Sequence, residues 1–101
     1  MVIEIVRLCS YLKPDWRCSY LRTKDGAEID LIIDRPGLPH ALIEIKSTIN
    51  AGERDVATLN RFSNAFSSAE LFCISRDPHE KKIGYVWCFP FKIALQKIGL
   101  S

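Results

Sequence analysis

The sequence lacks a long hydrophobic run, and this excludes one whole class of proteins. No apolar stretch in the 101-residue chain approaches the ~20 residues that a membrane-spanning helix needs. The segment Val2–Leu12 interrupts its apolar residues with Glu4 and Arg7, which is untypical of a secretory signal. We therefore expect a cytoplasmic protein with no membrane partner.

Closely spaced metal-binding residues are also scarce. The sequence contains only two histidines, and both lie in segments that resemble loops. The four cysteines are scattered, with no CxxC pair: Cys9, Cys18, Cys73 and Cys88. The spacing of a zinc finger is therefore absent. The simplest interpretation is four reduced and mostly buried thiols, although an even cysteine count in a secreted chain would favour disulfides.

A strong excess of one charge is missing as well. The formal net charge is +2, from 14 basic and 12 acidic residues, and the pI is near 8.4. This mildly basic balance permits a nucleic-acid partner without requiring one, since strongly basic binding domains usually exceed pI ~9. The length suits one domain and is too short for two separate cores. We expect a single domain over residues 1–101.

The hydrophobic pattern predicts helices and strands in alternation. Apolar residues at helical spacing predict helices, and runs rich in β-branched and aromatic residues between turn signals predict strands. The predicted helices are Val2–Leu12, Glu53–Ser67 and a short one from Pro90 to Gly99; the predicted strands are Trp16–Thr23, Glu28–Asp34, Ala41–Thr48, Glu70–Ser75 and Ile83–Phe89. Short turns, including Lys24-Asp25-Gly26, make the first three strands an antiparallel meander, and a helical crossover then returns the chain in parallel. The predicted class is α/β, with a mixed central sheet flanked by helices.

Three charged residues stand inside the apolar strands. Strand side chains alternate between faces, which predicts that Asp30 projects from one face of Glu28–Asp34 and that Glu44 and Lys46 share a face of Ala41–Thr48. Burying an isolated carboxylate or ammonium costs several kcal/mol. These charges therefore need a partner, which is either one another or a bound cation.

The predicted hairpin arrangement favours a metal site. Two neighbouring carboxylates, Asp30 and Glu44, raise each other's proton affinity unless a divalent cation lies between them. Oxygen ligands suit Mg²⁺ or Mn²⁺. Lys46 would then extend toward a phosphate, a layout that suits hydrolysis of a phosphodiester bond. The alternative is a solvated face, or a structural ion pair between Glu44 and Lys46.

Two stretches resemble a known family. The run YLRTKDGAEIDLII, residues 20–33, followed by ALIEIKST, residues 41–48, resembles the uncharacterised C-terminal domain of many bacterial and archaeal AAA-type ATPases, a member of the PD-(D/E)XK nuclease-like superfamily. The resemblance covers nearly the whole chain. It implies a restriction-endonuclease-like αβββαβ core, with Asp30 and Glu44 as metal ligands and Lys46 as the catalytic lysine. It further implies Glu4, on the first helix, as an additional acidic ligand, although Glu4 equally suits an exposed helix position.

The sequence departs from that family in one respect. No GxxxxGK[ST] loop occurs, so the chain cannot bind ATP in that way. The leading hypothesis is a metal-dependent nuclease that acts on DNA, with RNA as the less favoured substrate and with Arg22 and Arg54 as candidate contacts to nucleic acid. One alternative is an inactive nuclease-fold module that binds nucleic acid or a partner ATPase. Another is a truncated fragment that forms a homodimer to cover an exposed sheet edge or apolar face.

Overall fold

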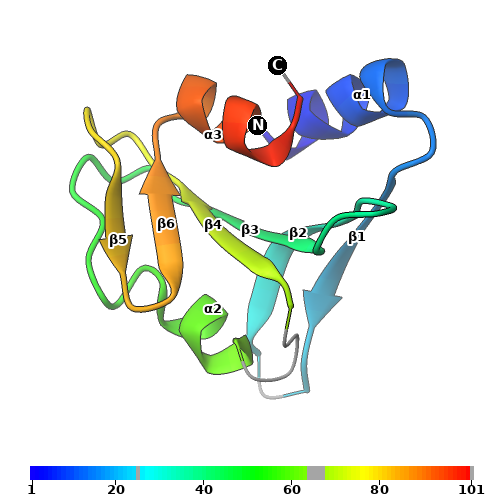
Figure 1. The fold of residues 1–101 in the computed structure, drawn as a ribbon. Helices are drawn as coiled ribbons and strands as arrows, with labels where there is room; N and C mark the ends of the chain where they lie inside the picture. Colours follow the sequence, from blue (N-terminus) through cyan, green and yellow to red (C-terminus); the bar gives the residue numbers. More distant parts are fainter. Residues whose placement is uncertain (25, 64–67, 101) are drawn as a thin grey trace.

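The computed structural model describes residues 1–24, 26–63 and 68–100 (Figure 1). A single sheet runs through the centre, with its strands in the order β1-β2-β3-β4-β6-β5. The elements are α1 (Val2–Leu12), β1 (Arg17–Arg22), β2 (Glu28–Asp34), β3 (Ala41–Ile45), α2 (Ala57–Phe62), β4 (Glu70–Ile74), β5 (Lys81–Ile83), β6 (Val86–Phe89) and α3 (Phe91–Ile98). This arrangement confirms the predicted α/β class.

The sheet is mixed. Strands β1, β2 and β3 form an antiparallel meander, β3, β4 and β6 are parallel to one another, and β5 is antiparallel to β6. The crossover through α2 takes the chain from β3 to the parallel neighbour β4, as expected for parallel pairing. The carboxyl ends of β3 and β4 therefore lie at the same edge of the sheet.

Helices cover both faces of the sheet (Figure 1): α1 and α3 lie on one face and α2 lies on the other. The core is accordingly divided in two. Ile5 of α1 and Ile98 of α3 pack against Ile33, Ile43 and other residues that share one side of the strands. On the opposite side, Leu59 of α2 packs in a second cluster that includes Ile32, Leu42 and Cys73. Both faces of the central strands are buried, which explains their nearly continuous apolar sequences.

Several predicted elements have different bounds in the structure. The strand predicted over Ala41–Thr48 ends at Ile45, so Lys46 lies just beyond β3, and three other elements are shorter by one or two residues. The segment Ile83–Phe89 is not one strand, because Gly84 adopts a φ of 61° and reverses the chain between β5 and β6. The helix predicted over Glu53–Ser67 is shorter in the structure, where α2 covers Ala57–Phe62 and residues 53–56 form turns. The rest of that prediction, residues 64–67, lies outside the described residues, and so does residue 25 of the predicted hairpin turn.

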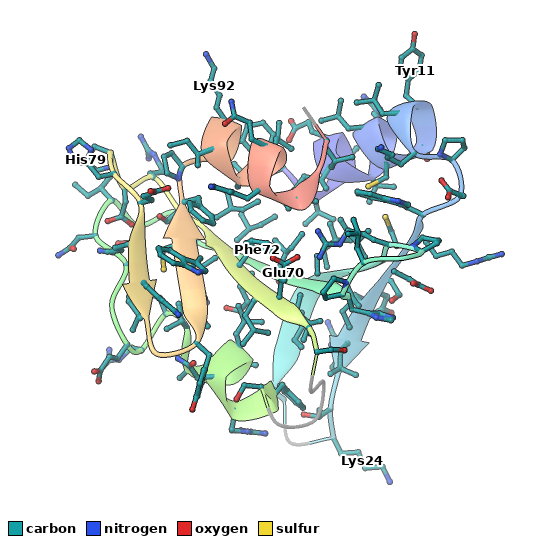
Figure 2. The ribbon with its side chains drawn as sticks, in the orientation of Figure 1. Tyr11, Lys24, Glu70, Phe72, His79 and Lys92 are labelled. Atoms are coloured by element: carbon teal, nitrogen blue, oxygen red, sulfur yellow. The ribbon has the colours of Figure 1, made fainter. Side chains whose placement is uncertain are left out.

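Arg35 joins the turn between β2 and β3 to the C-terminal helix. Its side chain is only 2% exposed. The guanidinium donates to the carbonyl oxygen of Pro39 through Nε at 2.9 Å and Nη2 at 2.6 Å, and to the carbonyl oxygen of Ile98 through Nη1 at 3.0 Å. Nη2 also lies 2.6 Å from Oε1 of Glu70, which lies with Phe72 between β4 and α3 (Figure 2). One side chain thus connects β2, β4 and α3.

Among the residues that the structure describes, no helix combines the length and apolar character needed to cross a membrane.

Candidate functional site

Asp30 lies where β2 and β3 separate. The ladder between these strands pairs Leu31 with Ile43, and the next position of the same register would place Asp30 opposite Glu44. Instead of a further backbone pair, the Asp30 carboxylate accepts the N–H of Ile45 through Oδ2 at 2.8 Å. Ile45 is the residue between Glu44 and Lys46. The Asp30 carboxylate is therefore fixed against the backbone that carries both other predicted site residues.

A β-bulge changes the direction of the Asp30 side chain. The register between β1 and β2 shifts between Ser19 and Leu21, so that two residues of β2, Asp30 and Leu31, stand opposite one residue of β1. A bulge of this kind re-aims side chains and interrupts strict alternation. Consistently, Ile29 and Ile32 both pack in the α2-side cluster, although simple alternation places them on opposite faces. The strict alternation predicted for Glu28–Asp34 is therefore wrong at this point.

The bulge brings Asp30 to a cavity beside the first helix. A cavity of about 170 Å³ is lined by Asp30 together with residues of α1, β1 and β2: Val2, Val6, Cys18, Ser19, Tyr20 and Leu31. Glu44 follows Leu42 by two positions on β3, and Leu42 packs in the cluster around α2. Asp30 therefore lines a cavity on the α1 side of the sheet, whereas Glu44 follows the strand positions that face α2.

Glu44 is a buried carboxylate with a cationic neighbour. It is 6% exposed, stands opposite Cys73 of β4, and has the Lys46 Nζ 3.5 Å from its Oε2. Burial raises the pKa of Glu44; Lys46 opposes this shift, and the nearby carboxylates of Asp30 and Asp55 add to it. The charged form of Glu44 is therefore only partly compensated by Lys46, and a cation at this position would stabilise it.

Asp55 is a further acid near Glu44 that the sequence analysis did not single out. It is half-buried in the turn before α2, and its Oδ2 accepts the N–H of Gly52 at 2.9 Å. The helix predicted over Glu53–Ser67 placed Asp55 in its first turn. The signal that identifies Asp55 is its spacing from Gly52, since an aspartate often accepts a nearby backbone N–H in a turn.

The structure does not bring Glu4 to the other acids. Its side chain is 64% exposed and its Oε2 lies 3.1 Å from the amino group of Met1. At about 100° per helical residue, Glu4 lies roughly 160–200° around α1 from Val2 and Val6, which line the cavity beside Asp30. Within the described ranges, no three side chains of His, Cys, Asp or Glu gather closely enough to hold a metal ion.

The two predicted nucleic-acid contacts are exposed. The Arg22 side chain is 69% exposed, with Nε 2.9 Å from Oε1 of Glu28 across the β1–β2 hairpin. Arg54 is exposed in the turn before α2, next to Asp55. Both positions are open to a ligand from solvent.

The donor set fits one kind of metal ion better than others. Mg²⁺ keeps several of its waters and takes one or two protein carboxylates, whereas structural zinc sites need four protein ligands. A donor set of two carboxylates, Asp30 and Glu44, matches the first pattern. Cys73 and Cys88 belong to the apolar cluster against α2.

Comparison with known proteins gives one match. Residues 1–93 match a sequence family described as a domain of unknown function, DUF4143. No curated protein and no solved structure matches the chain. Since the match covers most of the sequence, the chain belongs to the DUF4143 family.

Proposed function

We propose that this domain is a metal-dependent nuclease of the PD-(D/E)XK type that hydrolyses phosphodiester bonds of DNA. The observation that carries the proposal is the hydrogen bond from the Ile45 N–H to Asp30, because it joins one acid to the Glu44-Ile45-Lys46 segment. Asp30 and Glu44 would hold Mg²⁺ or Mn²⁺, and Lys46 would act on the substrate. The resemblance to the C-terminal domain of AAA-type ATPases supports the same assignment.

Each residue has a distinct role in this proposal. A bound divalent ion would polarise the phosphate and activate water. Asp30 is held in place by the Ile45 N–H, so its orientation needs no ligand. Glu44 is buried, with its pKa raised by burial first, and gains from a neighbouring cation. Lys46 is 40% exposed, so its ammonium can leave Glu44 and contact a phosphate that enters from solvent.

The positions of the exposed arginines suit a phosphate backbone. Arg22 and Arg54 lie on the surface, on the hairpin and on the turn before α2 respectively. Each contact between a basic side chain and a phosphate releases counterions, so binding would weaken as salt is raised. We expect Arg22→Met and Arg54→Met to weaken DNA binding and to reduce its salt dependence, with metal binding unchanged.

One alternative has its own support in the structure. Glu44 and Lys46 form an ion pair without a ligand, and Tyr20 on the edge strand β1 is 73% exposed. These features suit an inactive nuclease-fold module that binds nucleic acid, docks on a partner ATPase or forms a homodimer. In that case Lys46 has no catalytic role.

A cleavage assay distinguishes the two. Supercoiled plasmid, single-stranded DNA and RNA would be incubated with the purified domain in Mg²⁺, in Mn²⁺ and in excess chelator. We expect metal-dependent cleavage of DNA that falls at least about 100-fold in Asp30→Asn and in Lys46→Met. Lys92→Met is the matched control, because Lys92 is an exposed lysine that points away from α3 into solvent (Figure 2).

Three results would refute the nuclease assignment. They are cleavage that persists in chelator, equal activity in wild type and Lys46→Met, and the absence of both cleavage and calorimetric Mn²⁺ binding in the wild type. Salt-sensitive DNA binding that is unchanged in Lys46→Met would then favour the binding module. A sedimentation mass of two chains without metal or DNA affinity would favour the homodimer.

A further inference from the structure

Cys9 and Cys18 are brought together by a tight reversal of the chain. Helix α1 ends at Leu12, and the Lys13 N–H donates to the Cys9 carbonyl oxygen at 2.8 Å. The Trp16 N–H then donates to the Lys13 carbonyl oxygen at 3.0 Å, and β1 begins at Arg17. The second residue of β1 therefore returns to the last turns of α1. Cys18 packs against the apolar cluster that contains Cys9.

The two thiols differ in their access to solvent. Cys9 is 2% exposed in the core between α1 and the sheet. Cys18 is partly exposed and lines the cavity that also contains Ser19 and Tyr20. A reagent in solution therefore meets the sulfur of Cys18 first. Burial, together with the neighbouring Cys18, raises the pKa of Cys9 to about 12, so Cys9 has little thiolate to react by itself.

We propose that Cys9 and Cys18 form a redox modification site, which a small disulfide oxidant of the oxidised-glutathione class converts into an intramolecular disulfide. In the first step the Cys18 thiolate attacks one sulfur of the oxidant, whose disulfide bond breaks. A mixed disulfide forms and one reduced thiol leaves with a proton. In the second step the Cys9 sulfur attacks the Cys18 sulfur, the second reduced thiol leaves, and the proton of Cys9 goes with it. The two cysteines are oxidised by two electrons, and the oxidant is reduced to two thiols.

The other cysteine pair is an internal control. Cys73 and Cys88 stand opposite each other in the register of β4 and β6. Both are 0% exposed, and they lie in the core cluster on the α2 side of the sheet. Each pair lies within one packed cluster, whereas access from solvent is confined to Cys18. The folded protein should therefore oxidise at the first pair and keep the second reduced.

The disulfide would have a structural consequence. It would fasten α1 to β1 across the ten-residue segment Cys9–Cys18, beside the cavity that Asp30 lines. Closing a loop of this length restricts the unfolded chain and stabilises the fold. The oxidised protein should accordingly unfold at a higher temperature than the reduced one. This inference concerns the thiols alone and holds whether or not the domain cleaves DNA.

Mass spectrometry of the folded protein tests the proposal. Wild-type protein would be treated with oxidised glutathione in native buffer, residual thiols alkylated after quenching, and the peptides mapped. We expect the loss of two hydrogens, a Cys9–Cys18 linked peptide, and alkylated Cys73 and Cys88. Cys9→Ser should retain one glutathione on Cys18, and Cys18→Ser should form neither disulfide nor adduct.

Several outcomes would overturn it: no disulfide in the wild type, oxidation of Cys73 and Cys88 at the same rate as the first pair, or a linkage between two chains. Cys9 is a core residue, and its replacement can affect folding. The wild-type map therefore decides by itself, and circular dichroism of each variant establishes that the adducts come from folded protein.

Discussion

Replacing Arg35 with methionine should weaken the fold at the point where three elements meet. The guanidinium binds the carbonyl oxygens of Pro39 and Ile98 and the carboxylate of Glu70, and the side chain is 2% exposed. Methionine can fill much of the same space but donates no hydrogen bond. The turn that joins β2 to β3, and with it the register that sets Asp30 near Glu44, loses its connection to α3.

The size of the effect follows from the lost contacts. Each hydrogen bond from a charged donor to a buried carbonyl contributes about 1.5–3 kcal/mol, so the Pro39 and Ile98 acceptors together account for roughly 3–6 kcal/mol. Burial of the methionine side chain offsets about 1.5–3 kcal/mol of this. We expect Arg35→Met to lower the free energy of unfolding by about 3 kcal/mol. With an m-value near 1.5 kcal/mol/M, the urea midpoint would fall by roughly 2 M.

Two controls isolate the contribution of the buried contacts. Glu70→Gln removes the charge pair alone, and since Glu70 is 48% exposed we expect a loss of at most about 1 kcal/mol. Arg54→Met changes an exposed arginine and should shift stability by no more than about 0.5 kcal/mol. An Arg35→Met midpoint within about 0.5 M of the wild type would refute the reasoning, because the guanidinium would then have no structural role.

Three further predictions concern pH and backbone conformation. Glu44→Gln should raise the free energy of unfolding at neutral pH, because burial raises the folded-state pKa of Glu44 and its charged form therefore destabilises the fold. Thermal melts should show that this gain in stability disappears when the pH falls below the ordinary pKa of a glutamate. Burial also raises the pKa of Asp77, but hydrogen bonds from Lys81, Ser75 and the Ala51 N–H outweigh it and lower that pKa overall. Asp77→Asn should therefore lower the free energy of unfolding at pH values above the ordinary pKa of an aspartate. This loss should fade as the pH falls through the lowered folded-state pKa of Asp77, and a loss that stays constant over the same pH range would contradict the prediction. Gly37→Ala should lower the free energy of unfolding by about 1 kcal/mol, because Gly37 has a positive φ. Gly84→Ala should lower it by about 1 kcal/mol more, because a Cβ there would lie 2.8 Å from the Asn60 side chain. Equal losses for the two variants in urea titrations would contradict the contact with Asn60.

The parts of the fold set by local pattern could be predicted from the sequence. Val2–Leu12 and Glu28–Asp34 have the predicted bounds, because helical spacing and a β-branched run between turn signals determine them. The mixed topology followed from short turns and one helical crossover. These features depend on neighbouring residues, which the sequence displays directly.

The parts that failed depend on contacts between distant segments. The Asn60 side chain accepts the N–H of Tyr85 and donates to the carbonyl oxygen of Ile83, and so holds the β5–β6 turn from α2. Nothing near Gly84 in the sequence displays that contact, so Ile83–Phe89 resembled a single strand. Likewise the bulge at Asp30 arises from the register with β1, and the burial of Arg35 arises from acceptors on α3 and β4.

The same distinction applies to the candidate site. The sequence analysis predicted Asp30, Glu44 and Lys46 on neighbouring strands. In the structure Asp30 accepts the Ile45 N–H and Glu44 pairs with Lys46, which lies one residue beyond β3. Glu4 was assigned from the resemblance, and its position on the outer side of α1 depends on how the helix packs. Asp55 was missed because its relation to Glu44 comes from the turn between β3 and α2.

Asp30 and Glu44 are proposed to share a divalent ion, and anomalous diffraction from a crystal soaked in Mn²⁺ examines that shared ion independently of any activity. We expect an anomalous peak within coordination distance of both carboxylates in the wild type, and no such peak in Glu44→Gln. Well-ordered carboxylates with no anomalous peak between them, at Mn²⁺ concentrations that saturate other magnesium sites, would contradict it.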